Sequence, residues 1–141
     1  MDILLADANP TVRTALRLLI EQQAGFQVIG ECPDALNLFA QVTNRRPDVV
    51  LLDIDLPGLQ LPRRSVHSSL AELIQTLRSL APTLRVIALS SQPTAQITCL
   101  RAQADAFICK SDPPDALISL LECTLRSVTL ETVTLEKGTS L

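Results

Sequence analysis

Apolar residues occur along the chain in two alternating patterns. Short uninterrupted apolar runs, typical of strands covered on both faces of a sheet, are separated by longer segments with apolar residues every three or four positions. The short runs predict strands at residues 3–6, 26–30, 48–53, 85–89 and 106–109. The longer segments predict amphipathic helices that bury one face and expose the other.

The predicted helices begin and end at recognisable signals. Asn9 and Pro10 are a typical N-cap and first position of a helix that Gly25 ends, and Asp34 begins a second helix. The predicted buried faces are Val12, Ala15, Leu16, Leu19 and Ile20 in the first helix, Leu36, Phe39, Ala40 and Thr43 in the second, and Leu70, Leu73, Ile74, Leu77 and Leu80 in the third. A weaker helix is predicted over 94–103, and a last, leucine-rich helix begins at Asp112.

Strict alternation of strands and helices predicts an α/β fold, a doubly wound parallel sheet with helices on both faces and right-handed crossovers. The 141 residues fit one compact domain. A net charge of −3 disfavours direct nucleic-acid binding. The short basic cluster of Arg63, Arg64 and His67 is interpreted as part of a solvated loop.

Composition also limits the possible chemistry. Cys32, Cys99, Cys109 and Cys123 have no C-x-x-C spacing and are expected to be small buried hydrophobic residues rather than zinc ligands. The four glycines form neither a G-x-G-x-x-G nor a Walker pattern, so a nucleotide cradle is not expected. Without a charged leader or a long apolar span, we expect a soluble, cytoplasmic protein without membrane segments.

Polar residues stand directly at the ends of four predicted strands. These residues are Asp7, Asp53, Ser90 and Lys110. Because the carboxyl ends of parallel strands meet at one edge of a sheet, we expect the four side chains to form a pocket. Two carboxylates can hold a hard cation such as Mg²⁺, and a carboxylate can act as a nucleophile toward phosphorus. The pattern therefore favours phosphoryl transfer.

Five segments of the chain carry a family resemblance. They read ILLADANPTVRTALRLLI, VIGECPDAL, PDVVLLDIDLPG, RVIALSS and ADAFICK, in this order. Together they resemble the receiver domain of two-component response regulators, in particular receivers that precede a LuxR-type DNA-binding domain. The resemblance implies a flavodoxin-like (CheY-like) fold with five parallel strands in the order 2-1-3-4-5.

The resemblance also implies a role in phosphorelay signalling. It assigns Asp53 as phosphoacceptor, Asp7 as an acid-pocket residue that binds Mg²⁺, Ser90 as switch hydroxyl, Phe107 as switch aromatic and Lys110 as the pocket lysine. The implied partners are a histidine kinase or phosphotransfer protein, and an effector or second copy bound through the fourth helix, fifth strand and fifth helix. Beyond self-phosphorylation and autodephosphorylation, no enzymatic activity is expected. Phe107 has a second interpretation, as an ordinary core residue.

The pocket departs from the family pattern at two positions. Ala8 stands where most receivers have a second acidic metal ligand, so weak Mg²⁺ binding is expected. Asp55 lies two residues after Asp53, where its backbone carbonyl or side chain is a further potential ligand. Its charge has two opposite consequences: it supplies a metal ligand, or it repels the phosphoryl group. Asn9 is interpreted as a helix cap rather than as a substitute ligand.

The predicted organisation is a receiver-like domain over 1–127 and a tail or linker over 128–141. Residues 59–69 are interpreted as an insertion that forms either a surface loop or a lid near the pocket. Gln103 stands where a glycine often ends the fourth helix, which we expect to be short or displaced. For the tail, an unstructured end is favoured over an extended strand or dimer contact.

Three classes of function remain to be compared. The first is a phosphorylation switch with Asp53 as acceptor, working either as a stand-alone receiver or as part of a longer regulator. The second is a degenerate receiver that binds proteins without phosphorylation, for which Ala8 is the motivating feature. A flavodoxin-like enzyme is disfavoured because the chain has no nucleophile elbow, catalytic histidine or cofactor glycine loop.

Overall fold

The computed structural model describes the backbone of residues 1–58 and 66–139 and the side chains of residues 1–58 and 70–127. Strands and helices alternate along it. In chain order the elements are β1 (Asp2–Ala6), α1 (Pro10–Glu21), β2 (Gln27–Cys32), α2 (Ala35–Arg45), β3 (Val49–Asp53), α3 (Val66–Leu80), β4 (Arg85–Ser90), the 3₁₀ turn η1 (Pro93–Ala95), α4 (Gln96–Arg101), β5 (Ala106–Cys109) and α5 (Pro114–Thr139). The chain divides into two compact units, Met1–Ser111 and Asp112–Leu141.

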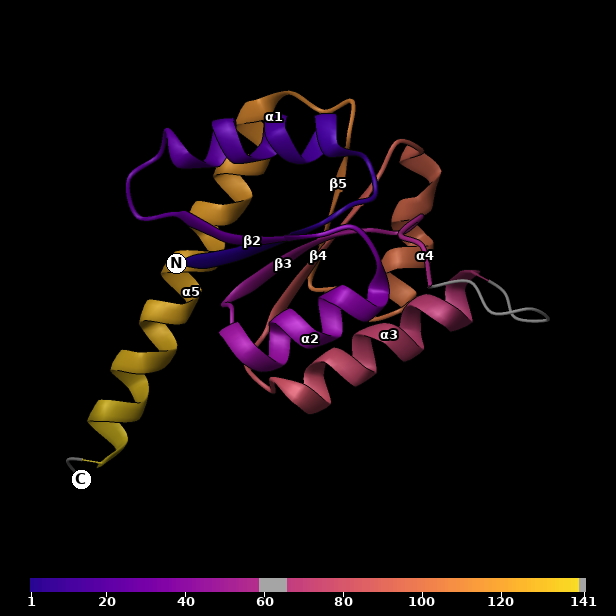
Figure 1. Ribbon diagram of the computed structural model, residues 1–141. Coiled ribbons are helices and arrows are strands. Elements are labelled where there is room, and N and C mark those ends of the chain that lie inside the picture. Colours follow the sequence, from indigo (N-terminus) through magenta and orange to yellow (C-terminus); the bar gives the residue numbers. More distant parts are fainter. Residues whose placement is uncertain (59–65, 140–141) are drawn as a thin grey trace. The chain divides into compact units, whose positions relative to one another are not determined.

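The five strands form one parallel sheet in the order β2-β1-β3-β4-β5, which confirms the predicted fold class (Figure 1). β3 lies at the centre and all five of its residues are buried. A strand in this position is covered on both faces, which explains why its sequence is apolar without polar alternation. Every strand ends at the same edge of the sheet because all of them run in one direction.

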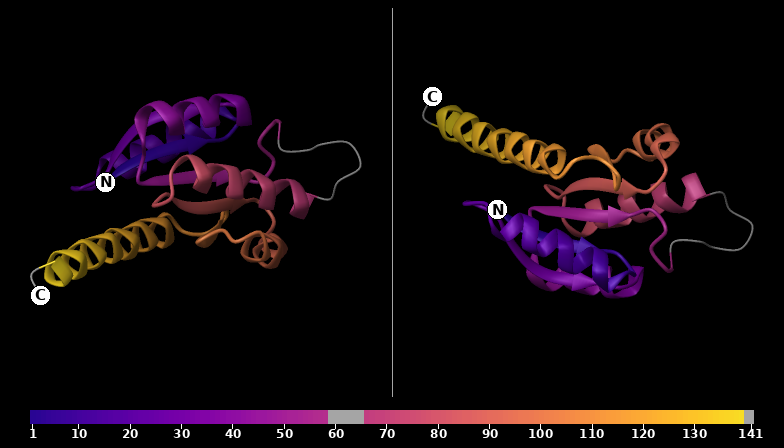
Figure 2. Two further views of the ribbon diagram at one scale, coloured as in Figure 1. Left: turned by 90° about the horizontal axis from the view of Figure 1, so that it is seen from below. Right: turned by 90° about the horizontal axis from the view of Figure 1, so that it is seen from above.

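Helices of the first unit cover both faces of this sheet. α1 lies on one face, and α2 and α3 lie on the other (Figures 1 and 2). The main core forms beneath α2, α3 and α4 and includes Leu38, Ile74 and Cys99, one from each helix. The buried side chains of β1, β3 and β4 complete it, so the central strands are anchored firmly against the helical layer.

The predicted buried face of the second helix is wrong at three of its four positions, while Phe39 is partly buried and packs against the core. Leu36 is 80% exposed, and Ala40 and Thr43 are exposed as well, whereas Ala35, Leu38 and Val42 are buried. Ala40 carries no large apolar surface, and the packing of Ala35, Leu38 and Val42 against the core sets the rotation of the helix. At its N-terminus the backbone N–H of Ala35 also donates to the Pro57 carbonyl at 2.9 Å. Ala15 of α1 and Leu80 of α3 are also exposed, at the margins of their predicted faces.

The helix boundaries follow the predicted capping chemistry. The Asn9 side chain accepts a hydrogen bond from the Thr11 N–H at 2.9 Å, which confirms Asn9 as the N-cap of α1. The fourth helix is short, as expected: η1 leads into only six residues of α4. Gln103 follows it with a φ of 70°, the left-handed conformation that favours glycine.

The C-terminal helix is longer than the sequence analysis expected. α5 extends to Thr139, so the predicted unstructured tail is helical there. Gly138 is the first glycine after Pro114, and no proline follows Pro114 in the helix, so no strong helix breaker interrupts it. Of the predicted insertion 59–69, residues 59–65 lie outside the described residues and 66–69 belong to α3.

None of the four cysteines forms a disulfide. Cys32, Cys99 and Cys109 are buried, but Cys123 is exposed, which corrects the expectation for that residue. Burial raises the pKa of Cys32 and of Cys99 to about 11, so both remain protonated at neutral pH. Among the described residues no helix is both long and apolar enough to cross a membrane.

Candidate functional site

The carboxyl edge of the sheet brings together the polar residues that follow the strands. Asp7 comes directly after β1, Asp53 ends β3, Ser90 ends β4 and Lys110 follows β5. Register pairs Asp53 with Leu89 and Ser90 with Cys109, so the four positions lie at nearly the same level of the sheet. The four positions share this edge, and the side chains of Asp7, Asp53 and Lys110 contact one another.

Lys110 joins the two aspartates. Its Nζ donates a hydrogen bond to Asp7 Oδ2 at 2.7 Å and lies 3.3 Å from Asp53 Oδ2. The Lys110 side chain is 25% exposed, while Asp7 and Asp53 are only 2% and 6% exposed. One ammonium group therefore serves two buried carboxylates, which leaves a local excess of negative charge.

This imbalance affects the protonation of Asp53. Burial raises the pKa of Asp53 above its ordinary value of 3.8, and the charge of Asp7 raises it further. The N–H of Asp55 and the ammonium of Lys110 act in the opposite direction without cancelling the rise in pKa. A carboxylate with a raised pKa is destabilised as an anion, which makes binding of an additional cation favourable.

The pKa of Lys110 is also raised, which favours its charged form. Burial lowers the pKa of Lys110, but the hydrogen bond to Asp7 and the charge of Asp53 outweigh burial, so its pKa lies above the ordinary 10.5. The ammonium is therefore fully charged at neutral pH. It can stabilise negative charge that develops close to either carboxylate.

Backbone N–H groups orient each aspartate toward Lys110. Asp7 Oδ1 accepts from the N–H of Asn9 at 2.9 Å, and Asp53 Oδ1 accepts from the N–H of Asp55 at 3.1 Å. A tight turn after β3 supports the second contact, because the N–H of Leu56 donates to the Asp53 carbonyl. In both residues one carboxylate oxygen is held by the loop and the other faces the lysine.

Ser90 lies at the end of β4, and Phe107 lies on the neighbouring strand β5. Ser90 is 1% exposed, and its Oγ accepts a hydrogen bond from the N–H of Gln92 at 3.0 Å. Its carbonyl accepts from the N–H of Lys110 at 2.8 Å, which couples the serine to the lysine through the backbone. Phe107 is half-buried and packs against the core.

The two departures from the family pattern both lie at the surface of this pocket. Ala8 is exposed and supplies no carboxylate beside Asp7. Asp55 is exposed too, and its backbone N–H is engaged by Asp53. The buried acids of the pocket in the described part of the chain are Asp7 and Asp53.

The pocket has the donor chemistry that a magnesium ion requires. Mg²⁺ prefers oxygen ligands and is commonly held by one or two carboxylates together with water. Asp7 and Asp53 fit this requirement, because Lys110 already demonstrates that a single cation reaches both carboxylates. Among the described residues, however, no three His, Cys, Asp or Glu side chains are grouped to hold a metal ion. The residues present therefore offer two carboxylates to such an ion, with water as the expected remaining ligand.

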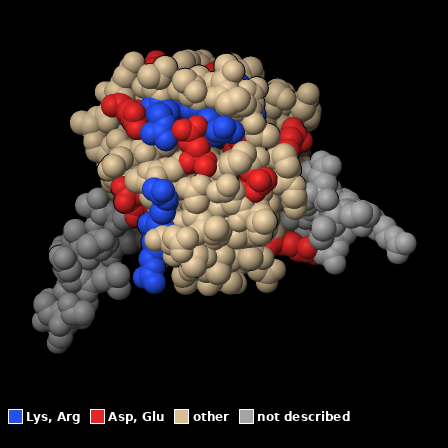
Figure 3. Space-filling view, in the orientation of Figure 1, with Lys and Arg blue, Asp and Glu red and all other residues tan. Residues whose placement is uncertain are grey.

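Sequence reasoning missed one set of residues near the pocket. Arg13, Arg17 and Glu21 lie outside the predicted buried face of the first helix, and nothing in the sequence indicated a contact with Asp7. In the structure Arg13 Nη1 donates to the backbone carbonyl of Asp7, and Arg13 Nε donates to Glu31 on β2. Figure 3 shows the interleaved basic and acidic side chains over α1 and β2. Only the packing of α1 on β2 reveals this link.

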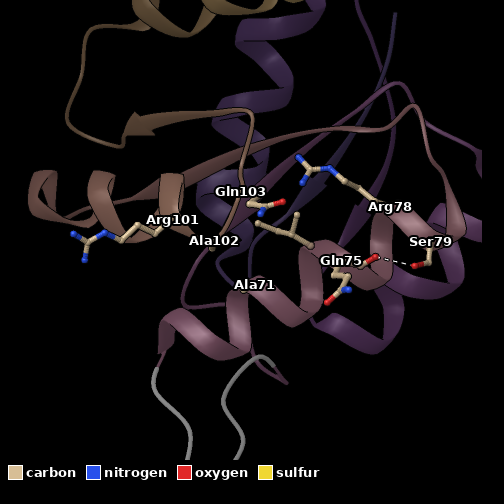
Figure 4. Close-up of a pocket in the computed structure, with 8 residues that line it drawn as sticks. Ala71, Gln75, Arg78, Ser79, Arg101, Ala102 and Gln103 are labelled. Atoms are coloured by element: carbon tan, nitrogen blue, oxygen red, sulfur yellow. Dashed lines mark hydrogen bonds between the residues drawn. The ribbon is translucent and has the colours of Figure 1, made fainter.

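A second cavity lies away from the carboxyl edge, between α3 and α4. It has a volume of about 390 Å³, with Ala71 and Ala102 among its lining residues (Figure 4). Its polar side chains do not converge: Arg78 is paired with Asp105 at 3.0 Å, and Arg101 points away from Gln103. This cavity lacks the set of convergent polar groups that a ligand site needs.

Comparison with known proteins supports the resemblance seen in the sequence. Residues 3–122 match the response regulator receiver domain family. The positive transcription regulator of virulence factors BvgA from Bordetella pertussis is 31% identical over 129 residues, which cover 90% of this chain and 57% of BvgA. The nitrate/nitrite response regulator protein NarL from Escherichia coli K12 is 28% identical over 121 residues, covering 84% of this chain and 52% of NarL. The chain thus spans little more than half the length of these relatives.

Solved structures of response regulators have the same fold. A LuxR-family two-component response regulator from Aurantimonas has a TM-score of 0.73 at 25% identity, covering 89% of this chain and 85% of that chain. The response regulator domain of Thermotoga maritima CheB has a TM-score of 0.65 at 24% identity, covering 89% of this chain and 94% of that chain, and shows the same fold. The chain therefore belongs to the response regulator receiver domain family and is similar to receivers of LuxR-family regulators.

Proposed function

We propose that the chain is a phosphorylation switch in which Asp53 accepts a phosphoryl group from a phosphohistidine of a histidine kinase or phosphotransfer protein in the cytoplasm. The observation that carries this proposal is the sharing of Lys110 by two buried carboxylates at the carboxyl edge of the sheet. Two buried carboxylates that share one ammonium are only partly compensated, so binding of a further positive charge stabilises them. A cation that enters with the phosphoryl group would compensate the remaining negative charge of the two carboxylates.

The transfer itself is a displacement at phosphorus. An oxygen of the Asp53 carboxylate forms the new P–O bond, and the P–N bond to the donor imidazole breaks. The electron pair of that bond remains on the nitrogen, which takes a proton from solvent. Lys110 stabilises the charge on the phosphoryl oxygens because its ammonium lies 3.3 Å from Asp53 and remains protonated.

Asp7, Asp53 and the backbone carbonyl or side chain of Asp55 are the groups that would hold Mg²⁺ in this pocket. When bound, the ion offsets the repulsion between the carboxylates and the incoming phosphoryl oxygens. Ala8 leaves the site one carboxylate short, which supports weak metal binding and slow phosphorylation at low Mg²⁺ concentrations. Asp55 is exposed and close enough in sequence to supply a compensating charge.

The output follows from the residues beside the pocket. Ser90 hydrogen-bonds a phosphoryl oxygen when Asp53 is modified, and Phe107 changes its packing in response. These movements alter α4 and β5, which bind an effector protein or a second copy of the chain. The net charge of −3 supports a protein partner rather than direct contact of this chain with nucleic acid.

A second candidate function is a degenerate receiver that binds its partner without phosphorylation. Ala8 is the observation that favours it, because the missing carboxylate weakens the metal site on which phosphorylation depends. In this case the pocket keeps Lys110 bridging Asp7 and Asp53 at all times. The domain then acts through a constant surface.

Intact mass spectrometry during incubation with acetyl phosphate, across a Mg²⁺ titration, separates the two functions. The switch predicts one added phosphoryl group per chain, which Asp53→Asn abolishes, whereas Asp55→Asn still accepts one at saturating Mg²⁺. Absence of modification at every Mg²⁺ concentration, in protein that is folded by circular dichroism, would establish the degenerate receiver instead.

Restoring the missing acid gives a sharper comparison. Ala8→Asp is expected to lower the Mg²⁺ concentration for half-maximal phosphorylation by about tenfold, because it adds a direct oxygen ligand to a site that has two carboxylates. The same titration, read by intact mass, measures the change. An unchanged Mg²⁺ requirement in Ala8→Asp, combined with a raised requirement in Asp55→Asn, would assign the third ligand to Asp55.

A further inference from the structure

One side chain outside the pocket holds the main chain of a pocket residue. Arg13, on the first turns of α1, donates from Nη1 to the carbonyl oxygen of Asp7 at 2.5 Å. Its side chain is 16% exposed, so much of the guanidinium is removed from water. A hydrogen bond from a charged donor is stronger than one between neutral groups. Arg13 therefore restrains the residue whose carboxylate contacts Lys110.

Arg13 is itself held from the other side. Its Nε donates to Glu31 Oε1 at 3.0 Å. The second oxygen of Glu31 accepts from Arg17 Nε at 3.2 Å and from Arg17 Nη2 at 3.0 Å. Both oxygens of the Glu31 carboxylate are thus occupied by guanidinium groups, and the planar fork of Arg13 has one defined orientation.

The network is connected to the sheet beneath it. Glu31 lies on β2 opposite Leu5 of β1, and the N–H of Asp7 donates to the carbonyl of Cys32 at 3.0 Å. Both backbone polar groups of Asp7 are consequently tied to β2, one directly and one through Arg13 and Glu31. With its main chain held at both groups, Asp7 has little freedom to move away from Lys110.

We propose that Arg13 is a positioning residue for the phosphoacceptor pocket, acting through the Asp7 carbonyl to keep the Asp7 carboxylate beside Asp53. This inference rests on the proposed function of the pocket. Its importance is greater here because Ala8 leaves Asp7 and Asp53 as the buried acids of the pocket, so no neighbouring carboxylate replaces a displaced Asp7. Groups that orient metal ligands commonly change metal affinity by 10–100-fold when removed.

The chain provides a matched pair of variants. Arg13→Ala and Arg17→Ala each remove one guanidinium from Glu31, but only Arg13→Ala removes the hydrogen bond to the Asp7 carbonyl. Glu31→Gln keeps the Arg13 side chain but replaces its ion pair with Glu31 by a weaker, neutral hydrogen bond. Urea unfolding of all three variants establishes which of them are folded before any functional comparison.

The first measurement is the acetyl phosphate reaction across a Mg²⁺ titration. We expect Arg13→Ala to raise the Mg²⁺ concentration for half-maximal phosphorylation by about tenfold, Glu31→Gln by less, and Arg17→Ala by less than about twofold. Equal changes in the Arg13→Ala and Arg17→Ala variants would overturn the proposal, since a merely structural ion-pair network treats the two arginines alike.

A second measurement does not depend on phosphorylation. The ¹H–¹⁵N signal of the Lys110 ammonium group reports its contact with Asp7, because only a sheltered, hydrogen-bonded ammonium exchanges slowly enough with water to be seen. We expect this signal to shift or broaden in Arg13→Ala and to remain in Arg17→Ala. If wild-type protein accepts no phosphoryl group, the proposed function fails, while this signal still decides the role of Arg13. An identical Lys110 signal in wild type and Arg13→Ala would overturn that role.

Discussion

At the scale of single residues, the pocket is defined by a mismatch between two buried carboxylates and one ammonium. Asp7 has the shorter contact with Lys110, 2.7 Å against 3.3 Å for Asp53. Asp53 is therefore the less well compensated of the two acids, in agreement with its raised pKa. The same imbalance that costs stability prepares Asp53 to interact with a further cation.

This imbalance predicts that Asp53→Asn stabilises the fold at neutral pH. Because the folded-state pKa of Asp53 lies above its ordinary value of 3.8, the folded protein binds this proton more tightly than the unfolded chain. The contribution of Asp53 is thus most favourable at low pH and is lost as the pH rises from 3.8 through the folded pKa. Asparagine carries no charge at any pH, so the variant does not lose this stability as the pH rises.

Urea unfolding between acidic and neutral pH measures the effect. The stability gain of Asp53→Asn is expected to be largest at neutral pH and to shrink on acidification below the folded pKa of Asp53. Asp55→Asn is the control, since Asp55 is exposed, and its effect is expected to stay within about 0.5 kcal/mol. A loss of stability in Asp53→Asn at neutral pH would contradict the assignment of Asp53 as an undercompensated acid.

Replacing Lys110 is expected to change the free energy of unfolding in the opposite direction. Lys110→Met leaves Asp7 and Asp53 buried without their shared cation, and we expect a loss of about 2–3 kcal/mol in the free energy of unfolding. The loss is smaller than for a fully buried pair because Lys110 is partly exposed. The full loss is expected from neutral pH up to about pH 10.5, and it disappears as the pH rises through the folded pKa of Lys110.

The comparison for Lys110→Met is Arg78→Met. Arg78 pairs with Asp105, but both side chains are about 30% exposed, and Asp105 keeps its hydrogen bond from the Val86 N–H. This variant is therefore expected to lose less than about 1 kcal/mol in urea unfolding at neutral pH. Similar losses from both variants would show that burial of the aspartates contributes little.

At the scale of secondary-structure elements, the end of α4 is the clearest case of local strain. The N–H of Ala104 donates to the carbonyl of Cys99, a contact that closes the helix through a left-handed residue. Gln103 occupies that position with a φ of 70°. A side chain in this conformation costs roughly 1–2 kcal/mol relative to glycine, before the greater chain entropy of glycine is counted.

Gln103→Gly is therefore expected to raise the free energy of unfolding by about 1 kcal/mol. Gln22, the C-cap of α1, provides the matched control because it is a glutamine after a helix with an ordinary φ of −73°. Gln22→Gly is expected to lower stability by about 0.5–1 kcal/mol. Thermal or urea unfolding of the two variants tests the sign, and a decrease in both would exclude strain at Gln103.

The elements also show where local sequence was sufficient and where it was not. The capping role of Asn9 was predictable because its side chain bonds a main-chain group two residues away. The buried face of α2 was not, because Leu36 and Leu38 are both apolar and local periodicity alone does not choose between them. The packing of Ala35, Leu38 and Val42 against the core decides the rotation of the helix.

At the scale of the first compact unit, stability is concentrated in the middle of the sheet. All residues of β3 are buried, and it pairs with β1 on one side and β4 on the other. η1 and α4 together span only nine residues and expose Ile97 and Leu100. The element expected to change with phosphorylation is thus short and lightly buried, and the strand that carries Asp53 is the most firmly held.

Native-state amide hydrogen exchange is expected to reproduce this order. Amides of β1 and β3 exchange only with global unfolding, whereas amides of α4 exchange through local opening at least about tenfold faster. Increasing urea below the unfolding transition distinguishes the two routes, because global opening responds strongly to denaturant and local opening does not. Protection of α4 equal to that of β3 would contradict a locally mobile output element.

Local sequence was sufficient to predict the alternation of elements, the α/β fold class and the polar residues at the strand ends. These features depend on local periodicity and on the rule that parallel strands end at one edge of a sheet. Two features required the packed fold: Lys110 lies closer to Asp7 than to Asp53, and Arg13 donates to the Asp7 carbonyl. Such contacts join residues on different elements, and their distances are set by strand register and by the seating of α1 on β2, which local periodicity does not encode.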